Sequence, residues 1–103
     1  MIKTGGINVA PVEVENILMS HPGVAQAFVV PLADAQRDEV VAALVVPAAQ
    51  GAVSEEQLRT LCRDALASYK RPRRYLFVGS EQVPLTSTGK IKKQAIPALF
   101  ESI

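Results

Sequence analysis

The sequence predicts an α+β domain: a small sheet of about three strands packed with two to three helices, plus an N-terminal two-stranded hairpin around a glycine turn. Three observations lead to this prediction. Two runs rich in β-branched residues flank a polar turn, an amphipathic helical pattern follows them, and a pair of glycines interrupts the extended start of the chain. Strands and helices mixed in this way are typical of helices packed on one small sheet.

The chain has room for one hydrophobic core, because it is 103 residues long. We therefore treat residues 1–103 as one domain. Hydrophobic residues make up 49% of the sequence, which favours a folded domain over a disordered tail. No apolar run approaches the roughly 20 residues of a membrane helix, so no membrane span is expected. Cys62 is the only cysteine and cannot form an internal disulfide, and we expect a cytoplasmic protein.

The first 20 residues predict a hairpin and then a helix. Gly5 and Gly6 allow the positive φ angles of a tight reversal between two short extended arms. Pro11 suits the first position of a helix, and Val14, Ile17 and Leu18 share one helical face. Ala10 is a poor N-cap, so we expect this helix to depend on tertiary packing.

The middle of the chain predicts a β-hairpin followed by a second helix. Residues 24–32 and 40–46 are the two apolar runs, joined by a polar turn. Ser54 and Gln57 match a capping box, and an apolar stripe that includes Cys62 follows them. Cys62 is therefore predicted to be a core residue rather than a nucleophile.

The last third of the chain predicts a third strand over residues 75–78 and a short helix from Pro97. It also carries an excess of positive charge. Up to Leu66 there are four basic and eight acidic residues, whereas from Ala67 there are seven basic and two acidic ones. This asymmetry suggests that the last third meets an anion.

Several classes of site are not supported by the sequence. His21 is the only histidine and lies in a helix-ending His-Pro-Gly segment, so neither a hydrolytic triad nor a metal centre is predicted. Nucleic-acid binding is not expected, because an RNA-binding sheet needs exposed aromatic side chains and the apolar run offers only Phe28.

The stretch VPLTSTGKIKK, residues 83–93, is the strongest candidate for chemistry. It does not match a phosphate-binding P-loop, because Pro84 stands where that motif has a glycine. We interpret it as a mobile arm in which Gly89 allows close backbone approach and Lys90 supplies a point charge for a phosphate or carboxylate. No nucleophile or base accompanies Lys90. The residues alone thus predict an accessory domain that contributes one cation to chemistry elsewhere.

Three motifs in order resemble one protein family over nearly the whole chain. IKTGGINVAPVEVE, YKRPRRYLFV and VPLTSTGKIKK look like the C-terminal domain of the superfamily of acyl-CoA synthetases, peptide-synthetase adenylation domains and luciferases, the adenylate-forming or AMP-binding enzymes. The resemblance implies an ATP-dependent carboxylic acid:CoA ligase that forms an acyl-adenylate and then an acyl-CoA thioester. It also implies a large N-terminal domain, absent from this chain, as the partner that holds the ATP and acyl sites and most of the Mg²⁺ contacts. This chain would be inactive alone.

The resemblance also assigns residues to the two half-reactions. Lys90 matches the lysine that reaches the carboxylate and the α-phosphate region during adenylation. After the small domain rotates, its glycine loop would line the channel through which the pantetheine thiol of CoA attacks. The implied substrate-binding residues are Thr4, Gly5, Gly6, Ile7 and Gly89. The candidates for contacts to the CoA phosphates are Lys70, Arg71, Arg73 and Arg74.

Two alternatives remain open at this point. One is an adenylation domain that hands its acyl group to a carrier protein, although the Gly-Gly-x-Asn pattern in the opening motif favours the CoA ligases. The other is a non-catalytic module that binds anionic partners. The sequence does not identify the carboxylic acid, because in the family the acyl pocket belongs to the other domain.

Overall fold

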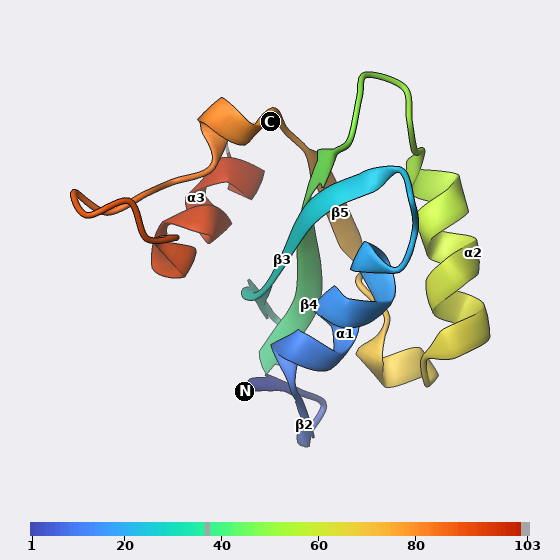
Figure 1. The fold of residues 1–103 in the computed structure, drawn as a ribbon. Coiled ribbons are helices and arrows are strands. Elements are labelled where there is room, and N and C mark those ends of the chain that lie inside the picture. Colours follow the sequence, from blue (N-terminus) through green and yellow to red (C-terminus); the bar gives the residue numbers. More distant parts are fainter. Residues whose placement is uncertain (37, 102–103) are drawn as a thin grey trace.

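The computed structural model describes residues 1–36 and 38–101, which form one mixed sheet with helices on both faces (Figure 1). The strands are β1 (Ile2–Thr4), β2 (Ile7–Val9), β3 (Val24–Asp34), β4 (Asp38–Pro47) and β5 (Arg74–Phe77). The α-helices are α1 (Pro11–Met19), α2 (Glu55–Ala65) and α3 (Ile96–Glu101). The short 3-10 turns are η1 (Ser68–Lys70), η2 (Ser80–Gln82) and η3 (Lys93–Ala95). The α+β prediction is confirmed.

Strand β4 is the centre of the sheet. β3 runs antiparallel along one side of it, which confirms the predicted hairpin. On the other side β5 pairs in parallel with residues 42–45 of β4, and β1 pairs through Thr4 and Asp38. β2 pairs only with β1 among the described strands, so the glycine hairpin extends the same sheet and makes it five-stranded.

Both faces of β4 are buried. Alternate residues belong to different clusters: Val41, Ala43 and Val45 to one, Ala42, Leu44 and Val46 to the other. Helices α1 and α2 cover the first face, and α3 covers the second through Ile96 and Phe100 (Figure 1). This double burial is the reason that residues 40–46 form an uninterrupted apolar run rather than an alternating one.

The two long helices begin differently, as predicted. Before α2, Ser54 Oγ accepts a hydrogen bond from Gln57 N at 3.2 Å, and Gln57 Oε1 accepts one from Ser54 N at 2.9 Å. The predicted capping box is therefore confirmed. Ala10 offers α1 no side-chain cap, and this helix is held by the buried side chains of Val14 and Leu18. No helix formed by the described residues has the length and apolar character needed to cross a lipid bilayer.

Candidate functional site

The segment around Lys90 forms a tight hairpin that projects beside α3 (Figure 1). Thr86 N donates to Lys90 O at 2.7 Å, and Lys92 N donates to Pro84 O at 2.9 Å. Gly89 N donates to Thr86 O at 2.9 Å. Gly89 has a φ of +84°, a backbone conformation that glycine adopts without steric cost. The predicted arm is thus a hydrogen-bonded turn that requires its glycine.

The threonine hydroxyls of this hairpin support its backbone. Thr86 Oγ1 accepts a hydrogen bond from Lys90 N at 3.1 Å and lies 3.0 Å from Thr88 Oγ1. The main chain of Lys90 is therefore fixed on both sides by Thr86. Its side chain is exposed and has no hydrogen bond or ion pair with any residue of 1–36 or 38–101. The hairpin thus presents to solvent an ammonium group that no described carboxylate neutralises.

The glycine turn between β1 and β2 is the second predicted feature. Gly5 and Gly6 have φ angles of +57° and +82°, which match a two-residue hairpin turn with both central residues left-handed. A Cβ on either residue would meet no atom within 4 Å, so conformation rather than crowding inside this domain requires glycine. Ile7 is exposed, whereas Thr4 is buried at 7% exposure. Three of the four predicted channel residues therefore lie on the surface.

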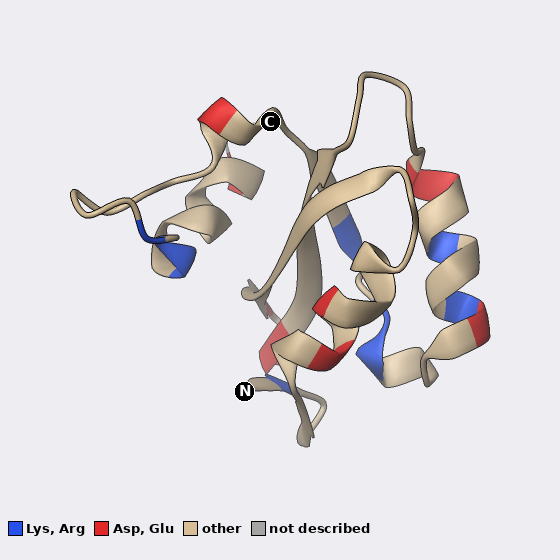
Figure 2. Ribbon diagram, in the orientation of Figure 1, with Lys and Arg blue, Asp and Glu red and all other residues tan. Residues whose placement is uncertain are grey.

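The structure does not bring Lys90 and the glycine turn together. Figure 1 shows the Lys90 hairpin on the side of the sheet that carries α3, whereas the glycine turn lies beyond the end of β4 at which Asp38 pairs with Thr4. The basic residues of the last third are likewise divided. Figure 2 shows some on the hairpin and η3 and others near η1 and β5. The basic residues of the last third are thus divided between two parts of the domain.

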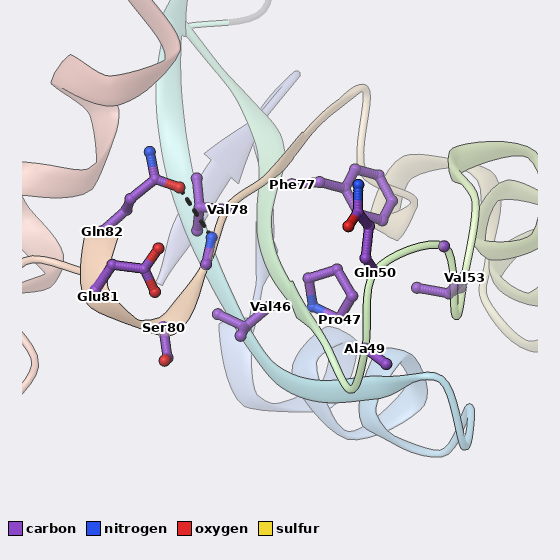
Figure 3. Close-up of a pocket in the computed structure, with 12 residues that line it drawn as sticks. Val46, Pro47, Ala49, Gln50, Val53, Phe77, Val78, Ser80, Glu81 and Gln82 are labelled. Carbon is purple, nitrogen blue, oxygen red and sulfur yellow. Dashed lines mark hydrogen bonds between the residues drawn. The ribbon is translucent and has the colours of Figure 1, made fainter.

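A pocket of about 650 Å³ lies at the carboxyl ends of β4 and β5 (Figure 3). Its walls include Val46, Phe77 and Val78, together with the turn in which Gly79 N donates to Gln82 Oε1 at 2.9 Å. None of the predicted site residues lines it. Across the described ranges, the His, Cys, Asp and Glu side chains form no group that could hold a metal ion. The described residues therefore do not fit a Mg²⁺ site.

Lys70 and Arg71 both have partners within the domain. Lys70 Nζ lies 3.0 Å from Glu13 Oε2, and the hydrogen bond to this carboxylate raises the pKa of Lys70. The Arg71 guanidinium donates to Leu66 O at 2.9 Å and to Arg63 O at 3.0 Å. It thereby satisfies carbonyl groups at the C-terminal end of α2.

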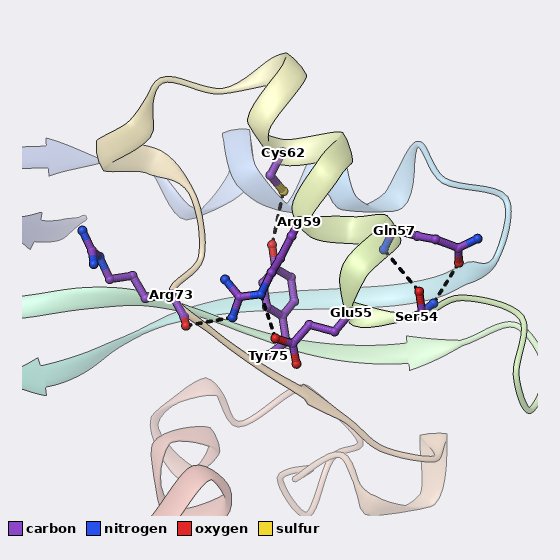
Figure 4. A network of polar contacts seen from close by, with 7 residues as sticks. All are labelled: Ser54, Glu55, Gln57, Arg59, Cys62, Arg73 and Tyr75. Carbon is purple, nitrogen blue, oxygen red and sulfur yellow. Dashed lines mark hydrogen bonds and ion pairs between the residues drawn. The ribbon is translucent and has the colours of Figure 1, made fainter.

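Arg74 and Arg73 differ from each other. Arg74 Nη2 donates to Phe100 O at 3.2 Å, and the guanidinium lies 5.6 Å from the centre of the Phe100 ring. Arg74 of β5 thus stabilises the packing of α3 against this strand. Arg73 forms backbone bonds, from its N–H to Val41 O and from Arg59 Nη2 to its carbonyl. Its side chain is exposed, points away from Arg59 in Figure 4 and has no partner within the described part of the chain.

Cys62 lies in the core, as predicted, at one end of a small polar network (Figure 4). Tyr75 Oη donates to Cys62 Sγ at 3.5 Å, and burial raises the pKa of both the Cys62 thiol and the Tyr75 phenol. Arg59 lies over the Tyr75 ring at 5.0 Å and pairs with Glu55 at 2.7 Å. These contacts join α2 to β5. Burial favours the protonated thiol, which does not suit a nucleophile.

One contact near the Lys90 hairpin has no counterpart in the sequence-based predictions. Lys93 Nζ lies 2.6 Å from Glu15 Oε2, and the same oxygen accepts a hydrogen bond from Val29 N at 2.8 Å. The three residues lie on η3, α1 and β3. They are far apart in the sequence, so no local periodicity signals their contact.

The family model for the AMP-binding enzyme C-terminal domain matches residues 13–90. The chain is 37% identical over 103 residues to 2-succinylbenzoate–CoA ligase of Bacillus cereus, covering 100% of this chain and 20% of that protein. It is 42% identical over 96 residues to a long-chain-fatty-acid–CoA ligase of Mycobacterium tuberculosis, covering 93% of this chain and 18% of that protein.

Solved structures of similar fold and sequence agree with this match. A fatty acyl CoA synthetase of Mycobacterium tuberculosis superposes with a TM-score of 0.87 at 38% identity, covering 99% of this chain and 20% of that one. The chain thus spans about a fifth of the length of these relatives. Since the family match covers most of the chain and the fold agrees, the chain belongs to the AMP-binding enzyme C-terminal domain family.

Proposed function

We propose that this chain is the mobile C-terminal domain of an ATP-dependent carboxylic acid:CoA ligase, which forms an acyl-adenylate and then an acyl-CoA thioester. Support comes from the family membership and from the two relatives described above, which are CoA ligases. The large N-terminal domain of the same polypeptide would be the partner of this chain. It would hold ATP, the acid and the accompanying Mg²⁺, and this chain would be inactive alone.

Lys90 is the observation that carries the proposal. During adenylation a carboxylate oxygen attacks the α-phosphorus of ATP, and pyrophosphate leaves with the electron pair of the broken P–O bond. Two anions must approach each other in this step. An ammonium group between them offsets their repulsion and stabilises the charge that develops on the phosphoryl oxygens. The exposed Lys90 side chain has no partner among the described residues and stands on a backbone fixed by Thr86, so it is suited to this role.

The glycine turn would serve the second step. There the pantetheine thiol of CoA releases its proton to solvent and its sulfur bonds to the acyl carbon. The bond from that carbon to the phosphate oxygen breaks, and AMP leaves with its electron pair. A turn built from Gly5 and Gly6 presents backbone without a Cβ to a narrow channel. Gly89 would give the same close approach beside Lys90. Since the two turns lie at separate places on the domain, one domain would have to reorient between the two steps.

One of the four candidates for a contact to the CoA phosphates stands out. Lys70, Arg71 and Arg74 are engaged with partners in this domain, whereas the Arg73 side chain is exposed and unpaired among the described residues. Arg73 is therefore the best-placed candidate for a CoA phosphate. We expect the reaction in the cytoplasm, where a single unpaired cysteine such as Cys62 stays reduced.

The experiment uses the full-length ligase with Lys90→Ala and assays each half-reaction separately. Adenylation is followed as pyrophosphate release from ATP and a panel of acids, with 2-succinylbenzoate and long-chain fatty acids among them. Thioester formation is followed from a supplied acyl-adenylate and CoA. We expect adenylation to fall about 100-fold or more, since one preorganised charge contact is lost, while thioester formation is retained.

Lys92→Ala is the matched control, because Lys92 is exposed on the same segment. Retention of adenylation in Lys90→Ala would contradict the proposal. If a carrier protein replaces CoA as an acceptor and free CoA does not react, the carrier-protein alternative holds instead. A non-catalytic module would show neither half-reaction in the full-length protein.

A further inference from the structure

We propose that Glu15 and Lys93 are positioning residues for adenylation, because their ion pair holds the base of the Lys90 hairpin against α1 and β3. The inference rests on the proposed role of Lys90 and assigns no direct contact with substrate to either residue.

The geometry joins three parts of the domain at one atom. Glu15 Oε2 lies 2.6 Å from Lys93 Nζ and accepts a hydrogen bond from Val29 N at 2.8 Å. The Glu15 side chain is only 12% exposed, compared with 42% for Lys93. A carboxylate this buried, with two donors on one oxygen, holds its geometry better than a surface ion pair, and salt screens it less.

The hairpin has few other attachments to the sheet. Its own hydrogen bonds, such as Thr86 N to Lys90 O, are internal and fix its shape but not its place. Leu85 and Ile91 pair across its base, and both are partly exposed, at 54% and 37%. Among the described residues, the contact of Lys93 with Glu15 is the one ion pair that joins residues 84–95 to the rest of the domain.

Lys93 also lies at the point where the chain leaves the hairpin for the buried α3. Ile91 and Lys93 line a groove of about 370 Å³ together with Glu15 and Phe28. Beyond Lys93, α3 is anchored through the core residue Ile96. The ion pair therefore stabilises the position at which the hairpin would otherwise rotate relative to the sheet.

This position matters because Lys90 is three residues before Lys93. A misplacement of about 1 Å at a reacting centre can cost up to about 100-fold in rate. Loss of the ion pair would leave the charge of Lys90 intact but its location less well defined. The kcat of adenylation should then fall while the KM for the acid and the thioester half-reaction change little.

The test compares Lys93→Met and Glu15→Gln in the full-length ligase, with the acid that gives the highest rate. Met keeps the stem of the side chain without the charge, and Gln keeps an oxygen for Val29 N. We expect each to lower the kcat of pyrophosphate release about tenfold and to leave thioester formation unchanged. Lys93→Arg should restore most of the rate, and Lys92→Met should resemble wild type.

A double variant separates positioning from a general structural effect. In a Lys90→Ala background, assayed at high enzyme concentration, Lys93→Met should cause no further loss, because it acts only through Lys90. Equal losses in both half-reactions, a further loss in that background, or an equal effect of Lys92→Met would overturn the inference. If Lys93→Met fails to fold, Glu15→Gln decides by the same criteria.

The two proposals fail in different ways. Full adenylation activity in Lys90→Ala removes the proposed function and this inference with it. Loss of adenylation in Lys90→Ala, with wild-type rates for Lys93→Met and Glu15→Gln, removes this inference alone.

Discussion

The basic side chains at residues 70–74 show how local partners decide what a charge can do. Arg71 bonds to carbonyl groups at the end of α2, and Arg74 bonds to α3. Arg73, between them, keeps an exposed guanidinium without a partner among the described residues. The basic residues that are adjacent in the sequence therefore differ in role. Some bind other parts of the domain, whereas Arg73 remains accessible to a ligand.

The first prediction at this scale separates Arg73 from Arg71. Arg73→Ala in the full-length ligase should raise the KM for CoA about fivefold, since an exposed phosphate contact contributes about 1 kcal/mol. Arg71→Ala should leave this KM unchanged but lower the free energy of unfolding of the 103-residue chain by about 1 kcal/mol. Thioester kinetics and urea unfolding measure the two effects. An equal rise in KM for both variants would contradict the division.

The second prediction concerns the pH dependence of stability. Burial raises the pKa of Cys62 and of Tyr75 above their ordinary values of 9.0 and 10.0. The unfolded chain therefore ionises first as pH rises. The contribution of these two groups to the stability of the folded chain is complete below about pH 9 and is lost progressively above it.

Urea unfolding between pH 7 and pH 11 measures this loss. Tyr75→Phe should remove the part of the decline that begins near pH 10, because its phenol no longer ionises in the unfolded chain. Tyr69→Phe is the matched control, since Tyr69 is 41% exposed. A decline that is unchanged in Tyr75→Phe, or removed equally in Tyr69→Phe, would show that another group is responsible.

At the scale of elements, α1 and α2 begin with unlike N-caps. The capping box before α2 satisfies two backbone N–H groups, whereas Ala10 before α1 satisfies none with its side chain. Ala10 already has the extended φ and ψ of an N-cap, −80° and 119°. The backbone is thus prepared for a side-chain cap that the residue cannot supply.

Ala10→Ser should therefore stabilise the 103-residue chain by about 1 kcal/mol. The reverse change, Ser54→Ala, should destabilise it by a similar amount because it removes an existing cap. Urea unfolding at pH 7 compares the two variants with wild type. A loss of stability in Ala10→Ser would mean that the serine oxygen does not reach the N–H groups of the first turn.

At the scale of the whole molecule, β4 belongs to both clusters of the core. One face packs against α1 and α2, and the other packs against α3. Loss of packing on either face therefore affects the same strand. The two sides of the sheet should unfold together.

Leu18→Ala on α1 and Leu44→Ala on β4 test this expectation, since both side chains are fully buried on opposite faces. Each should lower the free energy of unfolding by about 2–5 kcal/mol. Far-ultraviolet circular dichroism and tyrosine fluorescence should give one coincident transition in both variants. Val12→Ala, at a 60% exposed side chain, is the control and should change stability by less than about 0.5 kcal/mol. Separate transitions would show that the faces are independent.

Local patterns were sufficient to predict most elements, because strands, helices and caps depend on neighbouring residues. The capping box at Ser54 and the hairpin of β3 and β4 were found in this way. The ends of elements also depend on tertiary pairing, and β5 begins at Arg74, one residue before the predicted start.

Features that depend on distant residues could not be predicted. The glycine hairpin joins the main sheet through Thr4 and Asp38, and α3 covers the face opposite α1 and α2. In the candidate site, motifs pointed to Lys90 and Gly89. They gave no sign of the Glu15 contact with Lys93, because that contact exists only when α1, β3 and η3 come together.

The carboxylate of Glu15 has a second consequence, for the outer edge of β3. Among the described strands β3 pairs only with β4, so its other edge offers backbone groups to which a second chain could add. The N–H of Val29 points to this edge and already donates to Glu15. Pro31, two residues further along β3 on the same edge, has no N–H group. A strand from another molecule would have to displace Glu15 and would still lack a donor at Pro31. Glu15 thus also disfavours the pairing of this edge with a strand of another molecule.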